Sequence, residues 1–157
     1  MKILLIGSGG REHALAWSIA DSPLTRQLVI APGNPGMAAY GTLVDIAADD
    51  IEAICDYAAT MPADLVVVGP EVPLVMGLVD RLHERDIPAF GPTAAAAKLA
   101  GSKEFARAFC QRHKIPKPAF FPVDDYATAC QHIDALGDCV IKADGLAAGK
   151  GVVVAES

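Results

Sequence analysis

Hydrophobic residues recur along the first ninety positions in short unbroken runs, which alternate with longer amphipathic stretches. The runs are rich in Val, Ile and Leu without regular polar alternation, as expected of strands buried on both faces of a parallel sheet. They are Ile3–Ile6, Leu28–Ala31, Leu43–Ile46, Leu65–Val68 and Ala89–Phe90. The stretches between them predict helices over Arg11–Ala20, over Asp50–Thr60 with Asp49 as its cap, and over Pro73–Arg85 with proline at the first position. The alternation predicts an α/β fold with a doubly wound, mainly parallel sheet of about five strands.

The pattern changes in the last third of the chain. An alanine-rich helix is expected over Thr93–Ala100, followed after Gly101 by a second helix that Ser102 caps and that runs to His113. The segment Ile115–Pro118 contains two prolines and cannot continue a helix, so we expect a linker. We therefore place a domain boundary between Lys114 and Pro118, giving residues 1–114 and 115–157.

After this boundary the sequence predicts a strand, a helix and a hairpin. The strand covers Ala119–Phe121, and the helix is capped by Asp124 and ends near Gly137. The hairpin pairs Cys139–Ile141 with Val152–Ala155 around a glycine-rich loop. Because the chain ends one strand after this loop, we expect the lobe to which the hairpin belongs to be incomplete.

The loop of this hairpin is the strongest candidate for a ligand site. Its glycines and two nearby lysines can lay backbone N–H and ammonium groups along a polyphosphate. It is not a Walker A motif, because only three residues separate Gly145 from Gly149 and because Lys150 is followed by Gly151. Lys142 lies inside an otherwise apolar strand, which favours a mobile lid over a nucleotide. The alternative is an ordinary hairpin turn with surplus glycine.

A second glycine-rich loop, Gly7–His13, follows the first strand and opens the first helix. Glycines there allow the backbone to approach a ligand closely, and the helix N-terminus favours an anion. The dinucleotide fingerprint is incomplete, since Glu12 replaces its third glycine and no acidic residue ends the second strand. A nicotinamide-dependent oxidoreductase is therefore disfavoured, and a plain tight turn is the remaining alternative.

Two further loops fall at the carboxyl edge of the predicted sheet, where open α/β sheets bind ligands. They are Ala31–Gly36 and Gly69–Pro73. Glu71 is equally suited to accept hydrogen bonds from ribose hydroxyls and to stabilise a helix N-terminus. Lys103 begins a helix, where a cation is disfavoured; either a bound phosphate nearby or simple exposure explains it. His13 suits the face of a helix better than a substrate contact.

The composition of the chain argues against several classes of function. The net charge is −6 and aromatic residues make up only 6% of the chain, which argues against nucleic acid as the main partner. Four cysteines without CxxC or zinc spacing predict buried free thiols in a reducing cytosol. The first apolar run is too short for a signal peptide, and no run approaches a membrane span. No metal-ligand cluster and no nucleophile–histidine–acid set is apparent.

Five segments, in this order, resemble the phosphoribosylamine–glycine ligase (glycinamide ribonucleotide synthetase) family of the ATP-grasp superfamily. They are Lys2–Leu15, Ala31–Gly36, Gly69–Leu74, Gly101–Ala106 and Lys142–Gly151. The resemblance spans the chain and implies a Rossmann-like pre-ATP-grasp domain over residues 1–114, followed by the start of an ATP-grasp small lobe over residues 115–157. It also implies the joining of glycine to 5-phosphoribosylamine with ATP and Mg²⁺, through an acyl phosphate, in cytoplasmic purine biosynthesis.

The resemblance assigns roles to the loops. Residues expected to face the phosphoribosylamine are Gly9, Gly10, Arg11, Glu12, Asn34 and Glu71. Those expected to reach or cover the ATP phosphates are Lys103, Lys142, Gly145, Gly149, Lys150 and Gly151. Family members usually have Glu where this chain has Ala100, which we expect to be a minor surface change.

Family members are more than twice as long as this chain. The additional length would supply the magnesium ligands and most of the glycine site, so we expect this chain alone not to turn over substrate. The alternative is a stand-alone module that binds a nucleotide or sugar phosphate without catalysis. Related ATP-grasp carboxylases share the fold, but Gly10–His13 and Ala31–Gly36 favour the glycine ligases. The oligomeric state is left open.

Overall fold

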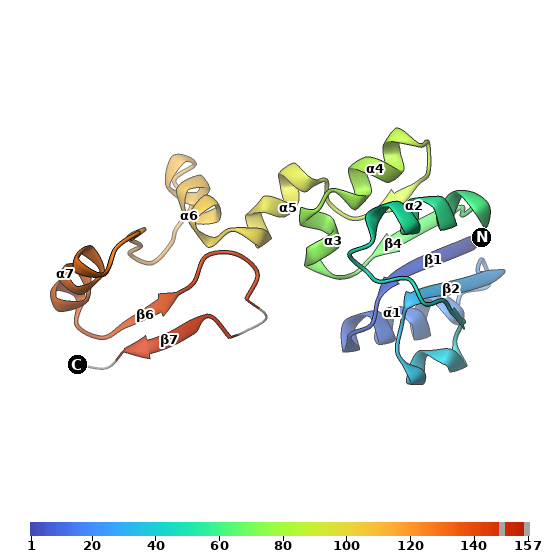
Figure 1. Ribbon diagram of the computed structural model, residues 1–157, viewed down its shortest axis with the longest axis horizontal. Helices are drawn as coiled ribbons and strands as arrows, with labels where there is room; N and C mark the ends of the chain where they lie inside the picture. The colour runs from blue at the N-terminus through green and yellow to red at the C-terminus, as the bar shows by residue number, and fades with distance from the viewer. Residues whose placement is uncertain (148–149, 156–157) are drawn as a thin grey trace. The chain divides into compact units, whose positions relative to one another are not determined.

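The computed structural model describes residues 1–147 and 150–155 of the chain. The chain divides into two compact units, Met1–Ala97 and Lys98–Ser157, shown in Figure 1. The boundary expected between Lys114 and Pro118 falls inside the second unit; as a statement about independently folding domains it stays a prediction.

The first unit is built on a five-stranded sheet in which every neighbouring pair is parallel. Its strands are β1 (Lys2–Gly7), β2 (Gln27–Pro32), β3 (Thr42–Leu43), β4 (Leu65–Val68) and β5 (Ala89–Phe90), in the order β3-β2-β1-β4-β5. The central strand β1 pairs with both β2 and β4, so that Leu4 lies opposite Val29 on one side and Val66 on the other. The α/β fold with a parallel sheet is therefore confirmed.

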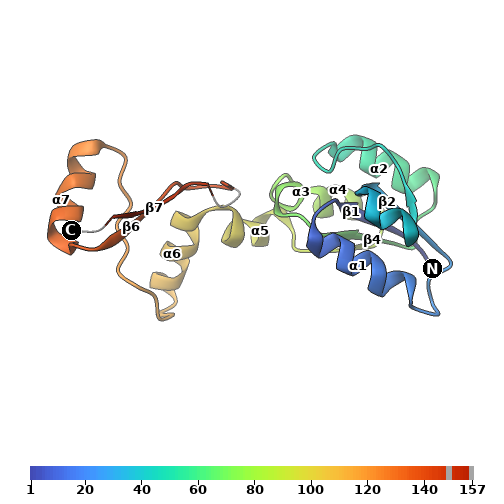
Figure 2. The same cartoon turned by 90° about the horizontal axis from the view of Figure 1, so that it is seen from below.

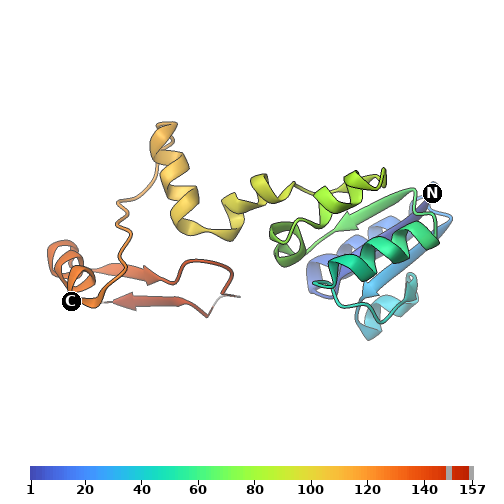
Figure 3. The same ribbon diagram turned by 45° about the horizontal axis from the view of Figure 1, so that its top comes forward.

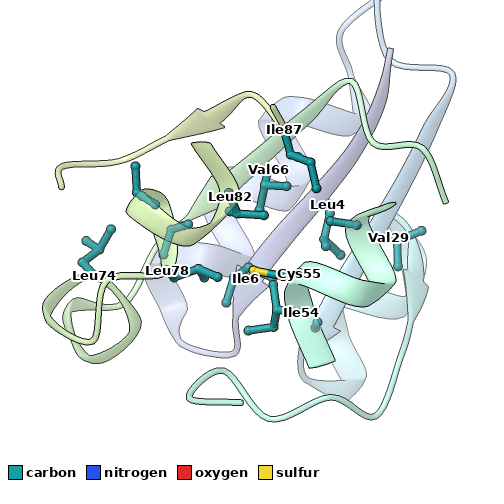
Figure 4. Close-up of a cluster of buried hydrophobic side chains, with 14 of the residues drawn as sticks. Leu4, Ile6, Val29, Ile54, Cys55, Val66, Leu74, Leu78, Leu82 and Ile87 are labelled. Carbon is teal, nitrogen blue, oxygen red and sulfur yellow. The ribbon is translucent and has the colours of Figure 1, made fainter. Parts of the chain in front are cut away.

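Helices cover both faces of this sheet, and Figure 2 shows α1 and α2 on opposite sides of it. The helical elements are α1 (Gly10–Ala20), the 3₁₀ turn η1 (Pro35–Ala39), α2 (Ile51–Thr60), α3 (Glu71–Val75) and α4 (Leu78–Glu84). Alternate residues of β1 serve the two faces, because side chains along a strand point in opposite directions. Leu4 and Ile6 pack with α2 and α4, as Figure 4 shows, whereas Ile3 and Leu5 pack with α1 and η1.

Three details of the first unit differ from the sequence-based expectations. The helix expected over Pro73–Arg85 is two helices, because Gly77 adopts a left-handed backbone with φ +88° between them. The third strand is Thr42–Leu43, and the residues expected to extend it lie outside the strand. The cap of α2 is Asp50, whose carboxylate accepts a hydrogen bond of 3.1 Å from the backbone N–H of Ala53.

The second unit consists of short helices and one hairpin, whose strands lie side by side in Figure 3. Its elements are α6 (Lys103–Arg112), α7 (Tyr126–Leu136) and the antiparallel strands β6 (Cys139–Lys142) and β7 (Val152–Ala155); α5 (Ala94–Gly101) joins the two units in sequence. Ser102 caps α6 as expected. The strand expected over Ala119–Phe121 is absent from this described segment, and α7 is capped by Asp125 rather than Asp124.

Burial differs sharply between the units. Every buried residue of the described chain lies at or before Ala97, and the buried hydrophobic side chains form two clusters on the two faces of the sheet. The four cysteines are free, but only Cys55 is buried, and burial raises the pKa of its thiol; the other three are half-buried. Within the described residues, no helix is both long and apolar enough to span a bilayer.

Candidate functional site

Three loops of the first unit meet at the carboxyl edge of the sheet because their strands are neighbours. The loop after β1 begins at Gly7, which lies opposite Pro32 at the end of β2, and the loop after β4 follows on the other side. Backbone hydrogen bonds of 3.2 Å join these loops, from the N–H of Gly33 to the carbonyl of Gly7 and from the N–H of Gly69 to the carbonyl of Ile6. The edge predicted to bind a ligand is thus a single surface formed by residues distant in sequence.

Arg11 connects the first of these loops to the third. Its Nη1 donates to the carbonyl oxygen of Gly69 at 3.0 Å and to Oε1 of Glu71 at 3.0 Å. The side chains are 63% and 46% exposed, so solvent screens the ion pair and its contribution to stability is about 0–1 kcal/mol. The backbone N–H of Glu71 and then Arg11 lower the pKa of the Glu71 carboxyl. Glu71 is therefore ionised at neutral pH and can accept hydrogen bonds from hydroxyl groups.

Glu12 is the only charged residue that is buried within the described chain, with 5% of its surface exposed. Its Oε2 accepts a hydrogen bond of 2.8 Å from the backbone N–H of Gly9, so the carboxylate turns back into the loop. Glycines surround it: an added methyl group at Gly7 or Gly69 would lie 2.5 Å from Cγ of Glu12. The sequence indicated that Glu12 breaks the dinucleotide fingerprint, but not that its carboxylate occupies the space beneath two loops.

Asn34 joins the second loop to the first. Its Oδ1 accepts from the backbone N–H of Gly36 at 3.0 Å and so caps η1, while its Nδ2 donates to the carbonyl oxygen of Ser8 at 2.9 Å. The ring of His13 lies beside Gly36 and is tilted against Tyr40, with centroids 5.6 Å apart. His13 therefore supports this loop from the face of α1.

A pocket opens at this edge, with a volume of about 400 Å³. Its walls include Gly7, Gly9 and Glu12 from the first loop and Pro70 from the third. Val72 and Pro73, from the predicted third loop, also line it, and so do Ala48 and Asp49, which no motif marked as site residues. A second pocket is lined by residues that include Met1 and Asp64, at the amino ends of β1 and β4, and by none of the predicted site residues.

In the second unit the amino end of α6 is bonded to the start of the glycine loop, which brings the predicted residues Lys103 and Gly145 together. Lys103 is half-buried, and its Nζ donates to the carbonyl oxygen of Gly145 at 2.8 Å. Its backbone N–H donates to Oδ1 of Asp144 at 2.6 Å. A bound phosphate or simple exposure was expected to explain a lysine at this helix start; in the structure a carboxylate of the chain, Asp144, lies on the first N–H groups of the helix. Lys142 and Lys150 are exposed, and no ion pair within the described residues involves them or Lys103.

The glycine loop between β6 and β7 closes tightly where it is described. The N–H of Ala143 donates to the carbonyl of Gly151 at 2.8 Å, and a methyl group at Gly151 would lie 2.9 Å from the Cβ atoms of Ala143 and Ala147. Gly145 has a φ of +84°, which favours glycine. Gly149, also predicted to cover the phosphates, lies outside the described residues. Ala100 is exposed, consistent with a surface position.

Residues 1–147 and 150–155 contain no group of three His, Cys, Asp or Glu side chains close enough to hold a metal ion. The described residues therefore do not fit a magnesium centre by themselves.

Comparison with known families identifies the family of the chain. The family model described as "Phosphoribosylglycinamide synthetase, N domain" matches residues 1–100, and that of its ATP-grasp (A) domain matches residues 101–157. The chain belongs to the phosphoribosylglycinamide synthetase family. The family junction at residues 100 and 101 lies close to the division between the two compact units.

Relatives within the phosphoribosylglycinamide synthetase family cover the whole chain. Phosphoribosylamine–glycine ligases from Rhizobium meliloti and Caulobacter vibrioides are 55% and 53% identical to it over 100% and 99% of its length. The crystal structure of the phosphoribosylamine–glycine ligase of Thermotoga maritima matches the whole chain with a TM-score of 0.76 and 28% identity. The chain spans 37%, 36% and 36% of these three proteins.

A more distant likeness concerns the fold alone. N5-carboxyaminoimidazole ribonucleotide synthetase of Thermotoga maritima matches 99% of the chain with a TM-score of 0.73 and 17% identity. The architecture is therefore shared by enzymes with different reactions, and the residues at the sheet edge must carry any functional argument.

Proposed function

We propose that this chain acts as the N-terminal part of a cytoplasmic, ATP-dependent ligase that joins glycine to 5-phosphoribosylamine in de novo purine biosynthesis. The products would be glycinamide ribonucleotide, ADP and phosphate. The observation that carries the proposal is the meeting of three loops at one sheet edge in a chain of the phosphoribosylglycinamide synthetase family. The names of its relatives support the same reaction.

The sheet edge of the first unit is proposed to bind the ribose phosphate part of the substrate. Glu71 would accept hydrogen bonds from ribose hydroxyls, since its carboxyl is ionised and half-exposed. Backbone groups of Gly9 and Gly10, with Arg11 and Asn34, would surround the same ligand. A direct contact by Glu12 stays a prediction, because its carboxylate is engaged with the N–H of Gly9.

The lysines of the second unit are proposed to bind the phosphates of ATP. Lys103, Lys142 and Lys150 fit this role because no carboxylate within the described residues neutralises their charges. Gly145 and Gly151, and by the family resemblance Gly149, would let the loop backbone approach the phosphates closely. ATP would supply the phosphoryl group that activates the carboxylate of glycine as an acyl phosphate, from which the amine of the ribosylamine displaces phosphate.

By the family resemblance, magnesium would be held by residues beyond those of this chain. In the proposal, the ion and most of the glycine site belong to the additional length found in the relatives. Residues 1–157 then contribute ribose phosphate binding and part of the nucleotide site, and we expect no turnover from them alone.

An amide NMR titration of the chain with glycinamide ribonucleotide tests the first half of the proposal. We expect shifts at Gly9, Gly10, Asn34 and Glu71, and none in the hairpin. Glu71→Gln should weaken binding, whereas Asp21→Asn, which changes an exposed carboxylate at the carboxyl end of α1, should not. A well-folded spectrum without shifts would contradict a ribose phosphate site on this unit.

A chimera tests the second half, with this chain replacing the matching 37% of the Rhizobium meliloti ligase. Ligase activity that falls when Lys142 is changed to Met would support the proposal. Activity unaffected by Lys142→Met would remove this lysine from the nucleotide site. Binding of both ligands by the chain, together with a chimera that is folded but inactive, would favour the stand-alone binding module.

A further inference from the structure

Asp144 occupies a position in the second unit for which the sequence suggested no role. It follows strand β6 by two residues and lies at the amino end of helix α6, more than forty positions earlier in the chain. Three groups of α6 and its cap donate to its carboxylate: the hydroxyl of Ser102 to Oδ2 at 3.0 Å, and the backbone N–H groups of Lys103 and Glu104 to Oδ1 at 2.6 and 3.2 Å. These bonds join the start of the glycine loop to the start of the helix.

The electrostatics of this contact explain its form. The first N–H groups of a helix lack intrahelical partners and carry a partial positive charge, so a carboxylate there is stabilised. The N–H of Glu104 contributes most to lowering the pKa of the Asp144 carboxyl, with further contributions from Ser102 and from the N–H of Lys103. Asp144 therefore remains ionised at neutral pH and satisfies helix donors that would otherwise face water.

Asp144 and its neighbour Gly145 bind Lys103 at its backbone and at its side-chain ammonium group. The carboxylate of Asp144 binds the backbone of Lys103, and the carbonyl oxygen of Gly145 accepts from its Nζ at 2.8 Å. Because this carboxylate is bound to N–H and O–H groups and forms no salt bridge with Lys103, the ammonium charge stays available for an anionic ligand. Lys142 precedes Asp144 by two residues, so the same contact also locates the strand end that carries the second lysine.

We propose that Asp144 is a positioning residue for the nucleotide, tying the base of the glycine loop to the amino end of α6 so that Lys103 and Lys142 meet the same polyphosphate. The inference rests on the proposed function and deepens it. It also implies that separate groups near α6 have separate partners. The N–H groups at the helix N-terminus bind Asp144, whereas ammonium groups and loop amides bind the phosphates. A nucleotide phosphate should therefore not replace Asp144 on the N–H groups of Lys103 and Glu104.

The test compares Asp144→Ala and Asp144→Asn with Asp134→Asn, a matched control on an exposed carboxylate of α7, in the chimera with the Rhizobium meliloti ligase. The affinity for a fluorescent ATP analogue is measured at equilibrium, and KM is measured for ATP, glycine and phosphoribosylamine. We expect Asp144→Ala to raise KM for ATP by about tenfold, as for the loss of one charge-assisted hydrogen bond. Asp144→Asn, which keeps one oxygen acceptor, should have a smaller effect, and the control none.

The KM values for the other two substrates and the melting temperature distinguish a positioning role from a general loss of structure. KM for glycine and for phosphoribosylamine, and the melting temperature, should change little in all three variants. An unchanged ATP affinity in Asp144→Ala would overturn the proposal, as would an equal rise of all three KM values, which indicates a merely structural role.

A second measurement separates this inference from the proposed function. In the chain itself, the amide shifts of Lys103 and Glu104 should follow the ionisation of Asp144 during an acid titration, and this response should disappear in Asp144→Asn. Absence of the response in the parent chain would overturn the contact even if the ligase reaction is confirmed. Failure of the parent chimera to bind any ATP analogue, with the response present, would count against the proposed nucleotide site and, with it, the role of Asp144 there.

Discussion

The two glycine-rich loops share one electrostatic feature, a carboxylate that binds backbone N–H groups, but differ in their surroundings. Each places a carboxylate on backbone N–H groups near a helix start: Glu12 on the N–H of Gly9, and Asp144 on the N–H groups of Lys103 and Glu104. Glu12 belongs to its own helix and is buried among glycines in a packed unit. Asp144 comes from a distant loop, in a unit where no described residue is buried.

The difference shows what kind of support each loop has. The first loop is held by packing, because the strands beneath it are buried on both faces and its glycines leave room for one side chain. The second is held chiefly by hydrogen bonds, which contribute only about 0.5–1.5 kcal/mol each in net terms. We therefore expect the first loop to tolerate little change in shape and the second to respond most to the loss of individual polar groups.

The largest expected effect comes from removing support beneath the first loop. Leu4 is fully buried at the centre of the sheet, so Leu4→Ala should lower the free energy of unfolding of the first unit by about 2–5 kcal/mol. Val154→Ala, at a hairpin residue that is 68% exposed, should change stability by no more than about 0.5 kcal/mol. Urea denaturation, with hydrogen exchange of β1 and β7 amides, measures both. Equal losses would mean that the hairpin is as tightly packed as the sheet.

The enclosure of Glu12 is tested within the loops themselves. Gly69→Ala would press a methyl group onto Glu12 and should cost about 1–3 kcal/mol, whereas Gly10→Ala, where an added methyl meets nothing within 4 Å, should cost nothing or stabilise α1. The free energy of unfolding measured by chemical denaturation decides this. In a Glu12→Ala background the cost of Gly69→Ala should shrink. A cost that persists there would mean that some group other than Glu12 causes the crowding.

A smaller effect on stability is expected at a third carboxylate at a helix start, that of Asp50, which caps α2 in place of the expected Asp49. Asp50→Ala removes the side chain that caps α2 and should cost about 0.5–2 kcal/mol. Asp49→Ala, at the residue first expected to be the cap, should change stability by less than about 0.5 kcal/mol, since Asp50 already binds the N–H of Ala53. Thermal unfolding of the two variants distinguishes them. The opposite ranking would restore Asp49 as the cap.

The smallest effect concerns the exposed pair at the sheet edge. The pKa of Glu71 is below its ordinary value of 4.5 in the folded chain, so its contribution to stability is present above pH 4.5 and is lost as the pH falls through the folded value. Arg11→Ala should raise the pKa of Glu71 only part of the way, because the backbone N–H of Glu71 is the larger cause. A carboxyl ¹³C titration measures this. Full return to the ordinary value would assign the shift to Arg11 alone.

The sequence was sufficient for the parts of the fold that depend on local pattern. The runs around Leu4, Val29 and Val66 are apolar without alternation because helices cover both faces of the sheet, and this alone predicted parallel strands. It was insufficient where an element depends on a partner or on one dihedral angle. Ala119–Phe121 has strand-like residues without a neighbouring strand in the described unit, and Gly77 breaks the expected long helix through a left-handed φ.

The candidate site also has a part that the sequence predicted and a part that it could not predict. Motif glycines, lysines and the Glu71 carboxylate were predicted from the residues and the family resemblance, and their roles remain predictions. The sequence could not show that Arg11 reaches Glu71, that Asn34 reaches Ser8, or that Asp144 reaches Lys103, because each pair joins loops far apart in the chain. The one available signal for Asp144 was its place in the Lys142–Gly151 motif, between a lysine and a glycine, which assigns no partner.

The central place of β1 in the sheet has a consequence for how the chain is made. Both strands that pair with β1 come later along the chain, and β4 ends only at Val68. A nascent chain that has not yet extended past this point presents one side of β1 with unpaired N–H and C=O groups, which can join to other chains. Pairing over such sequence distances is also slow. Residues Lys2–Gly7 are therefore fully paired only after the chain has been made as far as Val68, so exposure of β1 lasts longer than that of the hairpin strands, which lie close together in sequence.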